Sequence, residues 1–168
     1  MFDFRATVLT LALSVACATA AEPLPPPRGD VVLTVTGAIG ETNRPGAAEF
    51  DLEMLRSLGE VTLVTSTIWT EGPQQFRGVP LRAVLDRVGA AGSLIEASAL
   101  NDYLIEIPAS DAVAGGPIIA FEQNGMPLSV RDKGPLWVIY PYDADEAWRS
   151  EVIFARSIWQ LTDLDVLP

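Results

Sequence analysis

Three polar stretches of the chain combine side chains that could hold a small molecule. The first is STIWTEGPQQFRG, residues 66–78, in which Trp69 could stack on a flat ligand. Hydrogen bonds to that ligand could come from Thr70, Gln75 and Arg77. The alternative is that Trp69 packs in the hydrophobic core, as large aromatic side chains commonly do. Both interpretations stay open at this point.

The second stretch is the tripeptide Asn101, Asp102 and Tyr103, which opens a predicted strand. An aspartate beside an amide could orient a donor-rich heterocycle. Asp102 could equally make an Asx turn with the backbone.

The third stretch, SVRDKGP, contains the only lysine of the chain. Arg131 and Lys133 could bind an anion together with a free backbone amide at Gly134, where no Cβ hinders the approach. Against this, Asp132 lies between the two cations, and Asn124-Gly125 just upstream is typical of a surface hairpin. The sequence therefore leaves an anion site and a hairpin tip as alternatives.

Catalytic chemistry is difficult to assemble from this composition. The chain has no histidine and a single cysteine, so a serine nucleophile would lack its usual base. A pair of carboxylates remains conceivable, but sequence spacing does not show which carboxylates face each other. The acidic run 143–146 lacks the glycine-bent loop of an EF-hand and is interpreted as a solvated loop. We predict no catalytic residue and no metal ligand; the carboxylates considered are Glu71, Asp102, Glu106 and Glu122.

The N-terminus has the features of a secretory signal peptide. Residues 1–20 combine a basic residue, an apolar run too short to span a bilayer permanently, and a small-residue cleavage site. The mature chain is expected to begin near Ala21, with a proline-rich leader at 21–29 and a single domain at 30–168. Lipidation at Cys17 is the alternative. Either way, the expected location is periplasmic or secreted.

The chain is strongly acidic, with a formal net charge of −11. Nucleic acids and anionic membrane surfaces are therefore poor partners. Acidity also has a simpler explanation, the solubility of an exported protein.

Hydrophobic periodicity predicts an α+β fold with a mainly antiparallel or mixed sheet. Two short helices are expected, one capped by Asp51 and one started by Pro80. The C-terminal segment is expected to be a strand or edge segment that places Trp159 in the core. Loops are predicted at 39–50 and 71–80, and strands at 30–37, 60–70, 93–100, 103–108, 117–123, 135–143 and 155–166.

Several short motifs, weak individually, occur in an order that resembles the oxidoreductase molybdopterin-binding domain, the fold of the sulfite oxidase family. They include a Phe-Asp-Leu helix start, an Asn-Gly-x-Pro-Leu hairpin and a Gly-Pro-Leu before a strand that ends in proline. The resemblance spans essentially all of 30–168, and its motifs fall on Phe50–Leu52, Gly78–Leu81, Asp102–Tyr103, Asn124–Leu128 and Gly134–Pro141.

The resemblance implies a molybdenum cofactor held by a cysteine thiolate just after the strand at VTLVTST. Here Thr65, Ser66 and Thr67 occupy that region. A hydroxyl is a poor substitute for a soft anionic sulfur ligand. We therefore expect no cofactor, although the resemblance keeps molybdopterin possible.

The expected function is binding without turnover. The predicted partners are a small anionic or heterocyclic ligand and a membrane sensor protein. The alternatives are a molybdopterin-dependent oxidoreductase without a cysteine ligand and a purely structural interaction domain.

Overall fold

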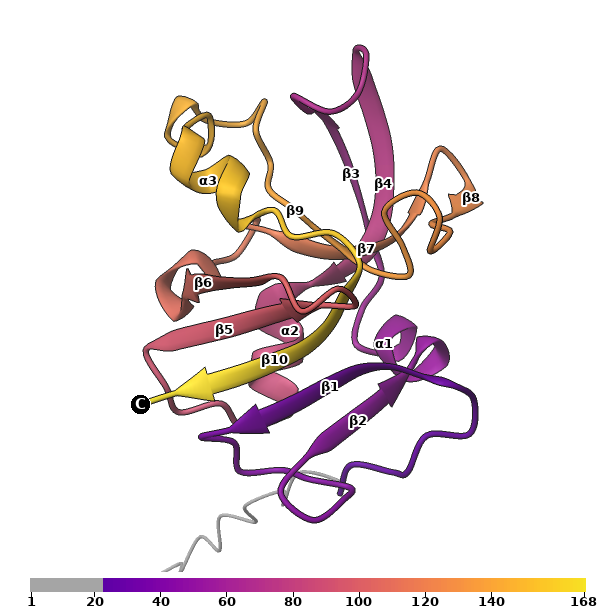
Figure 1. Cartoon of the computed structure of the whole chain (residues 1–168), viewed down its shortest axis with the longest axis vertical. Coiled ribbons are helices and arrows are strands. Elements are labelled where there is room, and N and C mark those ends of the chain that lie inside the picture. Colours follow the sequence, from indigo (N-terminus) through magenta and orange to yellow (C-terminus); the bar gives the residue numbers. More distant parts are fainter. Residues whose placement is uncertain (1–22) are drawn as a thin grey trace, which may run out of the picture.

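A computed structural model describes residues 23–168, so the predicted signal peptide at 1–20 lies outside the described residues. Two mostly antiparallel sheets and a few short helices form the fold, which confirms the α+β prediction (Figure 1). Within the described part of the chain, no helix has the length and apolar character needed to cross a membrane. The elements are β1 (Val31–Gly37), β2 (Ala48–Asp51), α1 (Leu52–Ser57), β3 (Val61–Ser66), β4 (Pro73–Pro80), α2 (Leu81–Arg87), β5 (Leu94–Ala99), β6 (Leu104–Pro108), η1 (Ala109–Asp111), β7 (Ile118–Gln123), β8 (Met126–Pro127), β9 (Trp137–Ile139), η2 (Glu146–Trp148), α3 (Glu151–Arg156) and β10 (Leu161–Leu167).

The first sheet has the order β2-β1-β10-β5-β6. β1 and β10 pair in parallel, with Val35 opposite Leu164, and the other pairs are antiparallel. The C-terminal strand is thus central, and the expectation that it could be an edge segment is wrong. A strand that closes the middle of a sheet depends on neighbours far away in sequence, which a local pattern does not reveal.

The second sheet has the order β3-β4-β7-β8, with β9 also paired to β7. β4 occupies most of the predicted loop at 71–80, so that prediction is wrong. Its prolines and glycine hide the strand pattern, but Phe76 and Val79 are fully buried between β3 and β7. Gly78 is required there, because a Cβ would lie 2.3 Å from the carbonyl oxygen of Ile119.

Local signals placed several elements correctly. The Asp51 side chain caps α1 by accepting a hydrogen bond from the Met54 amide at 2.8 Å. Asn124 and Gly125 both have positive φ values, 52° and 79°, and form the predicted hairpin between β7 and β8.

The elements that were not predicted include the short strand β2 and the helix α3. β2 lies within the segment interpreted as a loop and pairs with β1. α3 begins after Ser150, whose hydroxyl accepts a hydrogen bond from the Ile153 amide at 3.3 Å. Both elements are short, and packing against the rest of the fold stabilises them more than intrinsic propensity does.

The core lies where the two sheets and the helices meet, and burial of its apolar surface is the main favourable term in folding. Its largest fully buried side chains are Trp137, Tyr140, Tyr142, Phe50, Phe76, Leu33, Leu55, Leu81, Ile95, Ile107, Ile119 and Leu136.

The proline-rich leader is packed on this core. Leu24 is buried, and the Pro25 carbonyl accepts a hydrogen bond from the Asn43 side chain at 2.8 Å. The amides of Arg28 and Gly29 donate to one carboxylate oxygen of Asp51, at 2.7 and 2.8 Å. The same side chain therefore caps α1 and holds the leader.

Candidate functional site

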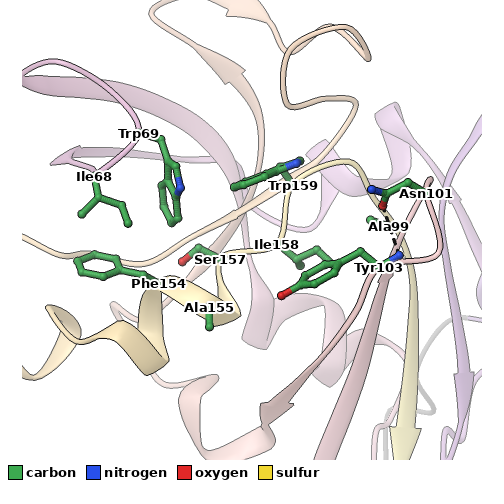
Figure 2. A pocket seen from close by; sticks show the side chains of 10 residues that line it. All are labelled: Ile68, Trp69, Ala99, Asn101, Tyr103, Phe154, Ala155, Ser157, Ile158 and Trp159. Atoms are coloured by element: carbon green, nitrogen blue, oxygen red, sulfur yellow. Dashed lines mark hydrogen bonds between the residues drawn. The ribbon is translucent and has the colours of Figure 1, made fainter.

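An aromatic pocket of about 460 Å³ opens near the start of β10 (Figure 2). Three segments far apart in sequence form it: the loop after β3, the turn between β5 and β6, and the segment from α3 to β10. Its volume lies within the range of small-molecule sites. Apolar side chains make up most of the lining, which comprises Ile68, Trp69, Ala99, Asn101, Tyr103, Phe154, Ala155, Ser157, Ile158 and Trp159.

Trp69 is half-buried and forms one wall of this pocket. Its ring makes edge contacts with Trp137, Phe154 and Trp159, at centroid distances of 5.7, 6.0 and 5.8 Å. The loop that carries it is held by Thr67, whose hydroxyl accepts from the Trp69 amide at 3.1 Å and bonds Thr70 at 2.7 Å. Trp69 thus packs on the core with one side and lines the pocket with another.

Trp159 is not in the core, which corrects the sequence-based expectation. It is 39% exposed and lines the pocket beside Trp69. The backbone turns at Gln160, a non-glycine residue with φ of 53°. This turn is fixed because the Gln160 amide donates to the Lys133 carbonyl and its carbonyl accepts from Leu100, both at 3.0 Å. The bend therefore holds the indole at the pocket mouth.

The turn at Asn101–Tyr103 contributes two of its three residues to the pocket. Asn101 and Tyr103 line it, and Asp102 sits between them with φ of 62°. The Asx-type hydrogen bond is made by Asn101, whose side-chain oxygen accepts from the Tyr103 amide at 3.3 Å. The expected Asx turn is present, but a different residue makes it.

The loop around Arg131 and Lys133 is only partly associated with this pocket. The Gly134 amide donates to the Ser129 carbonyl at 2.8 Å, so the prediction of a free amide for an anion is wrong. Arg131 is exposed and does not line the aromatic pocket. The Lys133 ammonium lies 5.3 Å from the ring centre of Trp137 and 5.5 Å from that of Trp159. Only Lys133 is therefore close to the aromatic cluster.

Residues 74–78, at the end of the first polar stretch, do not line the pocket. Arg77 forms ion pairs with Glu122 and Glu60, and Gln75 bonds the Asn124 hairpin through its backbone. Phe76 packs in the core against Trp137, with ring centres 5.5 Å apart. None of the three donors predicted from this stretch, Thr70, Gln75 and Arg77, lines the pocket.

A second hollow of about 350 Å³ adjoins the pocket and shares Ile68 and Phe154 with it. It lies where the resemblance would place the metal ligand, and its polar groups are already bonded. Asp143 accepts from the Ser66 amide at 2.6 Å and from Arg149 at 2.5 Å. The Ser66 amide bond, supported by Arg149, lowers the pKa of Asp143 from its ordinary value. Within residues 23–168, no cluster of three or more His, Cys, Asp or Glu is placed to hold a metal ion.

The sequence reasoning missed the wall made by α3 and the residues after it. Ser150 is a good helix-capping residue, and the helix that follows it has Glu151 in its first turn and Arg156 in its last. The cap and this order of charges were the available signal for a short helix.

Comparison with known proteins gives a family and a fold. Residues 46–150 match the family described as oxidoreductase molybdopterin binding domain. Among solved structures, the sulfane dehydrogenase SoxCD from Paracoccus pantotrophus is similar, with a TM-score of 0.61 and 16% sequence identity. The similarity covers 80% of this chain and 37% of that chain. No curated protein shows a significant sequence match.

Proposed function

Because the chain belongs to the oxidoreductase molybdopterin-binding domain family, we propose that it is an exported member that binds a small molecule without converting it. One observation carries this proposal. An aromatic pocket lies directly beside the end of β3, where the metal-binding thiolate would be expected, and that strand end carries only hydroxyl side chains.

The residues present do not fit a thiolate-bound molybdenum. Thr65, Ser66 and Thr67 offer hard oxygen atoms of high pKa in place of a soft anionic sulfur. Two of these residues are already engaged, because Thr65 accepts from the Asp143 amide at 3.1 Å and Thr67 bonds Thr70. Residues 23–168 contain neither cysteine nor histidine, so this part of the chain offers such a centre neither a thiolate nor an imidazole.

The pocket has the features expected of a binding site. It is concave and mainly apolar, and it presents a few polar groups, which is the usual composition of a small-molecule site. Trp69 and Trp159 lie side by side and supply rigid aromatic surface. The proposed ligand is a small heterocycle, and its capture would change the association of this protein with a membrane sensor protein.

The first test is the composition and ligand response of the protein purified from its native host. We expect molybdenum far below one atom per chain, and mass spectrometry should detect a co-purifying small molecule. Adding that molecule back should raise the free energy of unfolding by about 2.7 kcal/mol at a hundredfold excess over its Kd. Trp69→Ala should abolish this increase.

Met126→Ala is the matched control, because Met126 is 69% exposed in the β7–β8 hairpin and does not line the pocket. This variant should keep the full ligand response. Stoichiometric molybdenum with a pterin chromophore would instead support a molybdopterin-dependent oxidoreductase. If no small molecule co-purifies and candidate ligands change the stability of neither the wild type nor Trp69→Ala, the result would support a structural interaction domain.

Export is tested separately by cell fractionation and N-terminal sequencing. We expect the protein in the periplasm or the medium, with its N-terminus near Ala21. A membrane-bound form beginning at a lipid-modified Cys17 would support the lipoprotein alternative, and a cytoplasmic protein that retains Met1 would contradict export.

A further inference from the structure

The polar groups of the aromatic pocket are mainly hydrogen-bond donors. Trp69 and Trp159 carry indole N–H groups, which donate and never accept. In residues 23–168, neither of these two ring nitrogens has a hydrogen-bond partner, whereas Trp137 donates its own to the Ser157 carbonyl at 3.1 Å. In Figure 2 the Trp69 nitrogen lies on the side facing Trp159, and the Trp159 nitrogen on the side facing Asn101.

The other polar side chains of the pocket also offer mainly hydrogen-bond donors. The Asn101 oxygen is used by the Tyr103 amide, which leaves the amide NH₂ of Asn101 as a further donor. The Ser157 hydroxyl is already engaged with Tyr142 at 2.5 Å and with the Ile153 carbonyl at 2.9 Å. The Tyr103 hydroxyl, which also lines the pocket, can donate or accept. Donors therefore outnumber acceptors among these groups, and a ligand that satisfies most of them brings acceptors.

The charges in and around the pocket restrict the class of ligand further. None of the residues that line the pocket is ionised, and its walls are apolar, so a ligand charge would be desolvated without a direct partner. The net charge of −11 also disfavours an anion at long range. The donors that face the pocket disfavour a cation. Lys133 is the nearby cation and lies against the Trp137 and Trp159 rings.

We propose that this pocket binds an uncharged, planar ring that carries a carbonyl oxygen, with the indole N–H of Trp159, which faces Asn101, as the donor to that oxygen. The ring stacks on the aromatic walls, and the carbonyl takes the place of water on the Trp159 nitrogen. This inference rests on the proposed binding function and specifies its ligand class.

A matched set of naphthalene compounds tests the proposal by isothermal titration calorimetry on the purified protein. 2-Acetylnaphthalene carries the ketone, 2-methylnaphthalene lacks an acceptor, 2-naphthoate is an anion, and 2-naphthyltrimethylammonium is a cation. We expect the ketone to bind about fivefold to tenfold more tightly than the methyl compound, the effect of one net hydrogen bond. Equal affinity of these two compounds, tighter binding of either ion, or no binding by any of the four overturns the proposal.

Three tryptophan variants locate the effect. Trp159→Phe keeps an aromatic ring and removes the N–H, so the preference for the ketone should fall while binding of 2-methylnaphthalene changes little. Trp69→Phe removes an N–H that faces the Trp159 ring, so this variant should keep the preference. Trp148→Phe is the control, because Trp148 packs on Tyr140 and does not line the pocket. A preference for the ketone that survives in Trp159→Phe overturns the assignment of the donor.

Different results would refute the proposed binding function and the proposed ligand class. A co-purified molecule that stabilises the protein through Trp69, combined with no preference for the ketone, refutes only the ligand class. Absence of any ligand response to the co-purified material refutes the binding function itself.

Discussion

Replacing Glu122 with alanine is expected to lower the free energy of unfolding by about 2–4 kcal/mol, since the change breaks a buried ion-pair network. Glu122 is 4% exposed and lies on β7. One of its oxygens accepts from Arg56 at 2.6 Å, and the other is paired with Arg77. Glu60 bridges the same two arginines at 3.3 Å. The network joins α1, β4 and β7, so its loss should weaken the second sheet as a whole.

The pH dependence of stability provides a sharper measurement. Hydrogen bonding by Arg77, followed by that of Arg56, holds the pKa of Glu122 below its ordinary value. Because the folded pKa is depressed, this contribution is present above the unfolded-state pKa of about 4.3 and is lost as the pH falls through the folded value. The stability difference between wild type and Glu122→Gln should therefore be complete at neutral pH and shrink below about pH 4.

Urea unfolding across this pH range measures the difference, and Glu71→Gln is the control. Glu71 is exposed, and no ion pair of its side chain is present in the described residues. We expect Glu71→Gln to follow the wild-type curve within about 0.5 kcal/mol. A stability difference for Glu122→Gln that does not change with pH would contradict the ionised network.

The second large effect is expected at Asp51, where alanine should cost about 2–3 kcal/mol of stability. The side chain is 4% exposed and accepts three backbone hydrogen bonds, from Met54, Arg28 and Gly29. Its removal leaves the first turn of α1 uncapped and the leader amides without their acceptor. Hydrogen exchange should accelerate at these three amides before other regions respond.

Asp145→Ala is the matched control for this experiment. Asp145 also caps a short helical turn, η2, but its side chain accepts a single bond, from the Ala147 amide at 2.8 Å. It is exposed, so its loss should cost less than about 1 kcal/mol. Equal costs for the two variants would show that the leader bonds contribute nothing beyond ordinary capping.

The pocket and the Glu122 network are supported from opposite faces of the same strand, β4. Phe76 and Arg77 are adjacent on β4, and Phe76 packs on Trp137, which in turn contacts Trp69. The pocket wall is therefore supported by the same sheet that the ion pairs hold together. For this reason, ligand binding in the Glu122 variants should be measured only where unfolding curves show a folded protein.

Features that depend on near neighbours were predictable from the amino-acid sequence alone. Asp51 caps α1 through an amide three residues away, and Asn124-Gly125 forms a hairpin by the backbone freedom of two residues. The family resemblance could also be drawn from the order of short motifs, and the family match over 46–150 confirms it. The lack of cysteine and histidine in residues 23–168 is likewise a property of composition.

Which side chains share a site depended instead on how distant segments pack. Arg77 was a candidate ligand donor until the fold paired it with Glu122, 45 residues away. Trp159 was expected in the core, and the bend at Gln160, fixed by Lys133 and Leu100, brings it to the pocket instead. β4 is a strand because β3 and β7 lie on either side of it, despite its prolines and glycine. In each case the deciding contact joins segments distant in sequence, and its free energy depends on packing that no local window of residues contains.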